Sequence, residues 1–160
     1  MSALDVKIRT AVKADAGAIA RLVSTLAEKY IVGEFSDQGR DTLLRSMQPD
    51  MIASYIDSGY RYHVAATANG EIVGVVALRD NKHLYHLVVA EACQRQGIGR
   101  SLWETAMAEA LAHGNPGEFT VNSSRHALPV YERLGFIAGA EAVDTAGVIA
   151  IPMKLVARPE

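Results

Sequence analysis

Residues 94–100 read QRQGIGR and run directly into SLWETAMAEALAH, residues 101–113. Glycine inside a helix costs about 1 kcal/mol relative to alanine, so two glycines at the start of a helix need a reason. The first four N–H groups of a helix have no partner within it, and the helix dipole places partial positive charge there. An anion can reach them only where no side chain blocks its approach. Gly97 and Gly99 therefore favour a pyrophosphate-binding loop, with a tight strand-to-helix turn as the alternative.

Two common nucleotide motifs fit this stretch poorly. A P-loop has Lys followed by Ser or Thr directly after its second glycine, and here Arg100-Ser101 stands at the wrong spacing. The dinucleotide fingerprint needs a third glycine at position 102, where the chain has Leu102. Both nucleotide interpretations are therefore weak.

The bulk composition is that of a globular protein. The chain has 160 residues, 49% hydrophobic and 21% charged, which predicts one domain over residues 1–160. The net charge of −2 disfavours nucleic acid as a partner. No apolar run approaches the roughly 18 residues of a membrane span, no signal peptide pattern opens the chain, and Cys93 is the single cysteine. We expect a cytoplasmic protein with no membrane partner.

Hydrophobic periodicity predicts strands and helices in alternation. Asn69-Gly70, between two strand-like runs, is a strong hairpin signal. Asp15 is expected to cap the first helix, and Trp103, Met107 and Leu111 to line the buried face of the helix after residue 97. The expected strands are 6–12, 62–68, 71–79, 83–89, 118–122, 136–141 and 148–156, and the expected helices start at 15, 42, 49, 97 and 128. This order predicts one mixed sheet flanked by helices.

A wider segment around the glycines resembles a known family. Residues 88–102, VVAEACQRQGIGRSL, are similar to motif A of the GNAT superfamily of acyl-CoA-dependent N-acyltransferases, and Gln94, Gly97 and Gly99 fit that motif. Residues 121–124, Ala127 and the run YERLGF at 131–136 resemble its second signature, in which a Tyr lies four residues before Gly-Phe. The similarity covers nearly the whole chain in order. Residues 28–60, which would face the acceptor, carry no usable match.

The resemblance implies an α/β (α+β) fold. Its sheet is single, mixed and mostly antiparallel, with about seven strands, splayed fourth and fifth strands, and about four flanking helices. Acetyl-CoA is implied as co-substrate, lying in the gap between the splayed strands, and no metal is implied. The implied coenzyme-binding residues are Leu87, Val88, Val89, Gln94, Arg95, Gln96, Gly97, Ile98, Gly99, Arg100 and Asn122.

The implied reaction is attack of a primary amine on a thioester in a ternary complex. An amine with a pKa near 10 is only about one part in a thousand neutral at pH 7, so the site must help to remove a proton. The resemblance makes Tyr131 the candidate acid for the leaving thiolate. The alternative is that Tyr131 only packs on Phe136.

His83 is the first candidate for the base, because histidine titrates near neutral pH and relatives place a base or a water-holding residue there. Strand alternation puts His83, Tyr85 and Leu87 on one face and His86 on the other. A bulge could reverse this at His86, which makes His86 the second candidate. Water or Glu34 are the remaining alternatives.

The acceptor remains open. Residues 28–57 hold six acidic and three basic side chains, a mild hint of a cationic amine on a small molecule or peptide. The competing function is a non-catalytic acyl-CoA-binding regulatory module, and a homodimer is a candidate assembly.

Overall fold

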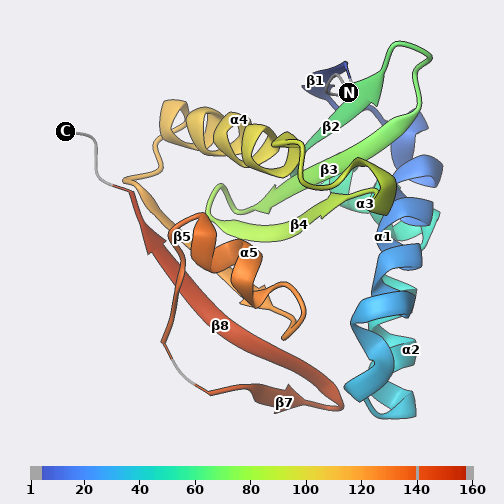
Figure 1. The fold of residues 1–160 in the computed structure, drawn as a ribbon, viewed down its shortest axis with the longest axis vertical. Helices are drawn as coiled ribbons and strands as arrows, with labels where there is room; N and C mark the ends of the chain where they lie inside the picture. Colours follow the sequence, from blue (N-terminus) through green and yellow to red (C-terminus); the bar gives the residue numbers. More distant parts are fainter. Residues whose placement is uncertain (1–4, 140, 158–160) are drawn as a thin grey trace.

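A computed structural model describes residues 5–139 and 141–157 (Figure 1). Within these residues the chain forms eight strands: β1 (Val6–Thr10), β2 (Arg61–Thr67), β3 (Ile72–Arg79), β4 (His83–Val89), β5 (Glu118–Ser123), β6 (Ile137–Ala138), β7 (Val143–Thr145) and β8 (Val148–Val156). The α-helices are α1 (Ala16–Tyr30), α2 (Asp37–Ser46), α3 (Pro49–Asp57), α4 (Ile98–Ala112) and α5 (Leu128–Arg133). Three short 3-10 helices are η1 (Lys13–Asp15), η2 (Val32–Glu34) and η3 (Glu91–Cys93).

The strands form one mixed sheet. Their order is β1-β2-β3-β4-β5-β8-β6, with β7 paired to β8, and every pairing is antiparallel except that of β4 with β5. The predicted mixed, mostly antiparallel sheet is confirmed. The described residues hold five helices, as many as the periodicity predicts and one more than the resemblance implies, and one strand more than expected, the three-residue β7.

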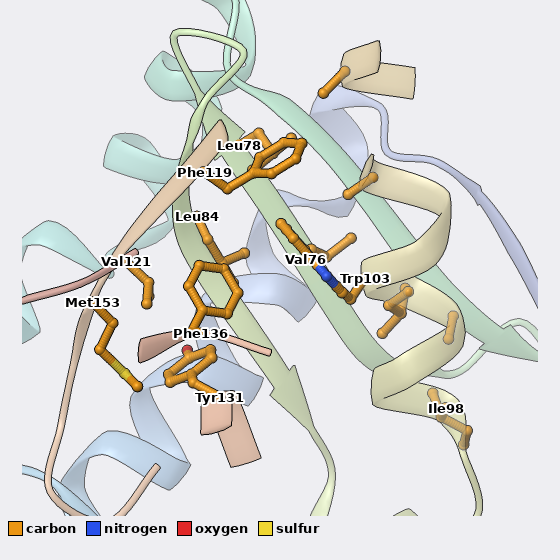
Figure 2. Close-up of a cluster of buried hydrophobic side chains, with 14 of the residues drawn as sticks. Val76, Leu78, Leu84, Ile98, Trp103, Phe119, Val121, Tyr131, Phe136 and Met153 are labelled. Carbon is orange, nitrogen blue, oxygen red and sulfur yellow. The ribbon is translucent and has the colours of Figure 1, made fainter. Parts of the chain in front are cut away.

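Two hydrophobic clusters cover the two faces of the sheet. One packs α4 and α5 against the sheet around Trp103, Phe119 and Phe136 (Figure 2). The other packs α1 and α3 on the opposite face around Ile19, Ile52 and Tyr62. The expected burial of Trp103 is confirmed and Met107 is partly buried, whereas Leu111 is 40% exposed because it lies toward the solvent side of α4.

Local signals in the sequence explain most of the element ends. Gly70 has a φ of +84° in the β2–β3 turn, where the Thr67 N–H donates to the Glu71 carbonyl. Asp15 is the N-cap residue of α1, as predicted, but its side chain makes no capping hydrogen bond to that helix. Its carboxylate accepts instead from the Val12 N–H at 2.8 Å and pairs with Arg9, so it holds the η1 turn that precedes α1.

The start of α2 docks on the turn between β7 and β8 (Figure 1). A Cβ at Gly39 would lie 2.1 Å from the Gly147 carbonyl oxygen, and a Cβ at Gly147 would meet the Ser36 hydroxyl. Gly147 also has a φ of +89°, which favours glycine. This backbone contact closes the side of the fold on which α1 and α2 lie.

Candidate functional site

The central feature of the sheet is a gap between β4 and β5. These parallel strands pair only at His83 with Thr120 and at Leu84 with Val121, and then diverge. Figure 1 shows the β1–β4 half of the sheet turning away from the half that contains β5 and β8. The predicted splay is confirmed, and it leaves the backbone from Tyr85 to Val89 without a strand partner on the β5 side.

A bulge in β4 changes which residues share a face. Ala77 pairs with His86 and Leu78 with Leu84, so Tyr85 has no partner on β3. His86 consequently lies with Tyr85, its ring against Tyr62 and Tyr85 on the α1–α3 side. Leu87 packs with Leu84 in the α4-side cluster. The expected strict alternation is therefore wrong for Leu87, and the alternative of a reversal at His86 is correct.

The N-terminus of α4 lies at the open end of this gap. Gly97 caps the helix with a φ of +82°, and a Cβ there would meet nothing within 4 Å. A Cβ at Gly99 would touch only the Val89 side chain, at 3.6 Å. The first turn carries no acidic residue. The N–H groups of Ile98, Gly99 and Arg100 are therefore accessible to an anion, and the helix dipole favours one there.

Two polar side chains near this helix start already bond to the protein. The Gln94 side-chain amide donates to the Val89 carbonyl at 3.0 Å and fixes the loop to the end of β4. The Arg100 guanidinium donates to the Arg133 carbonyl at 3.4 Å and ties α4 to the end of α5. Neither contact uses the backbone N–H groups at the start of α4, which remain available to an anion.

Tyr131 lies where β4 and β5 begin to part. Its ring packs edge-on against Phe136, with centroids 5.9 Å apart, in the cluster that includes Leu84 and Val121. Figure 2 shows its oxygen directed away from α5 into this cluster. Burial raises the pKa of Tyr131 to about 12, so the phenol is protonated at neutral pH.

His83 lies at the closed end of the gap. Its Nδ1 is hydrogen-bonded to the Thr120 hydroxyl at 2.8 Å, and burial, with a smaller contribution from Arg79, lowers the pKa of the imidazole. His86 is 7% exposed, its Nε2 has no hydrogen-bond partner, and burial lowers its pKa to about 4. Both rings are therefore neutral at pH 7.

A charged cluster that the sequence did not reveal lies at the end of α1. Lys29 pairs with Glu91 at 2.7 Å, Tyr30 donates to the same carboxylate, and the Tyr30 ring stacks on His126 with centroids 4.3 Å apart. Arg125 Nε lies 3.3 Å from Glu34 Oε2. These partners are far apart in the chain, so local sequence patterns do not pair them. The acidic composition of residues 28–57 was the single sequence feature that pointed to this cluster.

This cluster surrounds a pocket of about 250 Å³. Its walls come from the end of α1, from η2 and from the loop between β5 and α5, and are formed by Lys29, Tyr30, Ile31, Gly33, Glu34, Arg125 and His126. Among residues 5–139 and 141–157 no group of three or more His, Cys, Asp or Glu side chains could hold a metal ion. In the same part of the chain, every helix is too short or too polar to cross a membrane.

Known proteins share both the sequence pattern and the fold. Residues 31–157 match the family model "Acetyltransferase (GNAT) domain". N-acetyltransferase family 8 member 3 of Rattus norvegicus is 31% identical over 104 residues, 58% of this chain and 46% of the rat protein, so the chain spans about half of that relative.

Solved structures extend the similarity to the whole fold. A GCN5-related N-acetyltransferase of Rhodopseudomonas palustris matches with a TM-score of 0.79 at 20% identity, over 98% of each chain. The PaiA N-acetyltransferase of Thermoplasma acidophilum, in complex with coenzyme A, matches with a TM-score of 0.72 at 17% identity over 96% of this chain and 99% of its own. YncA of Salmonella typhimurium, solved with its cofactor acetyl-CoA, gives 0.68 at 24% identity over 98% of each chain. With the family model covering most of its length, the chain belongs to the GNAT acetyltransferase family.

Proposed function

We propose that this protein is an acetyl-CoA-dependent N-acetyltransferase that acts as one domain over residues 1–160. The observation that carries the proposal is the divergence of β4 from β5 after Leu84 and Val121, with the bare N-terminus of α4 at the open end. Relatives of the same fold hold coenzyme A or acetyl-CoA, which supports an acyl-CoA as the ligand.

The residues around the gap fit the parts of an acylated pantetheine carrier. Leu87, Val88 and Val89 offer backbone groups that have no β5 partner, so an extended arm can bind there as an added strand would. Asn122, exposed near the end of β5, faces the same arm in this proposal. The backbone N–H groups from Arg95 to Arg100 receive the pyrophosphate.

The titratable groups supply the two proton transfers of direct attack. His83, neutral at pH 7, accepts a proton from the acceptor ammonium through water, which leaves the amine lone pair free for the thioester carbonyl. The C–N bond forms, the nitrogen gives its second proton to water, the C–S bond breaks, and Tyr131 donates its proton to the departing sulfur, while His83 releases its proton to solvent. Tyr131 regains a proton from solvent before the next turnover.

A matched pair of glycine variants tests the coenzyme site. Gly99 and Gly17 each stand second in a 15-residue helix, and a Cβ at Gly17 would meet nothing within 4 Å. Glutamate near a helix N-terminus interacts favourably with the helix dipole, so neither Gly99→Glu nor Gly17→Glu is expected to unfold the protein. Calorimetry with acetyl-CoA should show loss of binding by about 100-fold or more in Gly99→Glu, from repulsion and blocked access, and wild-type binding in Gly17→Glu.

Thiol release with a panel of amines then tests the reaction. Turnover with at least one amine, abolished in Gly99→Glu, is the expected result. Tight acetyl-CoA binding without turnover on any amine would instead support a non-catalytic acyl-CoA-binding regulatory module. Absence of binding by well-folded protein would overturn both.

A further inference from the structure

Two cationic side chains, Lys29 and Arg125, line the pocket at the end of α1, and they differ in how they are bonded. Lys29 already has a partner, because Glu91 accepts its hydrogen bond at 2.7 Å and this contact raises the pKa of Lys29. Arg125 lies beside Glu34, with its Nε 3.3 Å from Glu34 Oε2, and 59% of its side chain is exposed. Its two terminal nitrogens make no hydrogen bond within the described part of the chain, so this edge of the guanidinium is available to a ligand.

Arg125 also lines two pockets. It lines the pocket with Tyr30 and Glu34, and it lines a second one with Leu128, Glu141 and Ile151. The Arg125 guanidinium can therefore turn toward a ligand in either pocket while its backbone keeps its place in the loop between β5 and α5. That loop begins directly after β5, at the end of the strand that has separated from β4.

Two stacked aromatic rings form part of the pocket wall. Tyr30 and His126 stack with planes 8° apart, and the Tyr30 hydroxyl is held by Glu91. On the Gly33 side a Cβ would meet nothing within 4 Å, so the pocket is open there. The site thus combines one carboxylate, one guanidinium and a flat apolar surface within a volume suited to a small ligand.

We propose that Arg125 and Glu34 bind an acceptor that carries a carboxylate next to its amine, as a free amino acid does. The inference rests on the proposed function and names the class of its acceptor. The Arg125 fork receives the carboxylate in bidentate geometry, and Glu34 receives the ammonium. The single pair at 3.3 Å is replaced by two pairs, so no charge in the pocket is left without a partner.

An amine without a carboxylate cannot make this exchange. Its ammonium shares Glu34 with Arg125, and the terminal nitrogens of the guanidinium gain no partner. Opening the existing pair costs little, because an exposed ion pair contributes little to stability. Selectivity then arises from the contact that the carboxylate adds.

The test uses pairs of acceptors that differ in this one group: free L-amino acids and their carboxamides. For wild-type protein, kcat/KM from thiol release should be higher for the amino acid. Arg125→Ala should lower it about 10- to 100-fold for the amino acids, mainly through KM, and leave the carboxamides within about twofold. Arg21→Ala removes the same charge from an exposed position on α1 and should behave as wild type.

The outcomes separate this inference from the proposed function. Equal losses for both acceptors in Arg125→Ala, or a wild-type preference for carboxamides, would overturn the role of Arg125 while acetylation stands. If no amine is acetylated, calorimetry of the protein–coenzyme A complex with amino acids decides. Binding that Arg125→Ala abolishes and Arg21→Ala retains would support the site, and absence of binding would overturn it.

Discussion

The Nδ1 of His83 and the hydroxyl of Thr120 lie 2.8 Å apart and bridge β4 and β5 at the first position of their short parallel pairing. Two residues later along each strand, the strands have separated. The hydrogen bond therefore fixes the imidazole at the closed end of the gap and determines which ring nitrogen remains available. This contact makes the proposed role of His83 testable without removing the ring.

Thr120→Val should disturb the orientation of His83 while preserving the shape of the side chain. We expect kcat to fall about 10-fold, since a misplaced base loses part of the 10²–10⁴-fold contribution typical of general base catalysis. Thr120→Ser keeps the hydroxyl and should stay near wild type. His83→Ala should also remove the limb of the pH–rate profile that rises from acid toward neutral pH. An unchanged limb in His83→Ala would exclude His83 and leave His86, water or Glu34.

Tyr131→Phe removes a single oxygen and keeps the ring that packs edge-on against Phe136. If Tyr131 protonates the departing sulfur, kcat should fall by about 10²-fold or more, while calorimetric affinity for acetyl-CoA stays within about twofold. The free energy of unfolding, measured with urea, should change little because the apolar contacts remain. Normal turnover would return Tyr131 to a packing role alone.

Gly39→Ala should destabilise the contact between α2 and the β7–β8 turn. The added methyl would lie 2.1 Å from the Gly147 carbonyl oxygen, so one backbone must move, and we expect a loss of about 1–3 kcal/mol in unfolding free energy. Gly33→Ala, in the nearby η2, meets nothing within 4 Å and should be neutral or slightly stabilising. Urea midpoints of the two variants measure the difference. Equal midpoints would show that the contact between α2 and the β7–β8 turn adjusts to the added methyl without loss of stability.

Much of the fold followed from local patterns. His83–Val89 was predicted with both ends correct, because a short run rich in large apolar and aromatic residues after a turn signal indicates a strand without reference to the rest of the chain. The start of α4 was predicted from Gly97. Its positive φ is a local backbone property that the residue type itself can indicate. β7 was missed because its three residues are all exposed and give no burial periodicity.

The candidate site was harder to predict from local sequence patterns than the fold was. One bulged residue in β4 exchanged the faces of His86 and Leu87, and periodicity cannot place such an insertion. The pairs Lys29–Glu91 and Glu34–Arg125 join residues 62 and 91 positions apart, so they arise only from the tertiary fold. Tyr131, His83 and the coenzyme-binding residues stay predictions, for which the structure supplies compatible positions.

His86 should make stability depend on pH in mildly acid solution. Its ring lies against Tyr62 and Tyr85, and its Nε2 has no partner. The folded protein binds a proton there only below its pKa of about 4, whereas the unfolded chain does so below the ordinary value of 6.5. Between these values the unfolded state binds more protons, so stability falls as pH drops from 6.5 toward 4, by up to ~3 kcal/mol.

His86→Leu tests this origin of the acid sensitivity. It removes both the titration and a buried nitrogen without a partner, so it should be neutral or stabilising at pH 7 and should flatten the loss between pH 6.5 and 4. Part of the slope will persist, because burial also lowers the pKa of His63 and of His83. Urea unfolding at half-unit pH steps measures both proteins, and equal slopes for wild type and His86→Leu would show that the protonation of His86 does not limit stability.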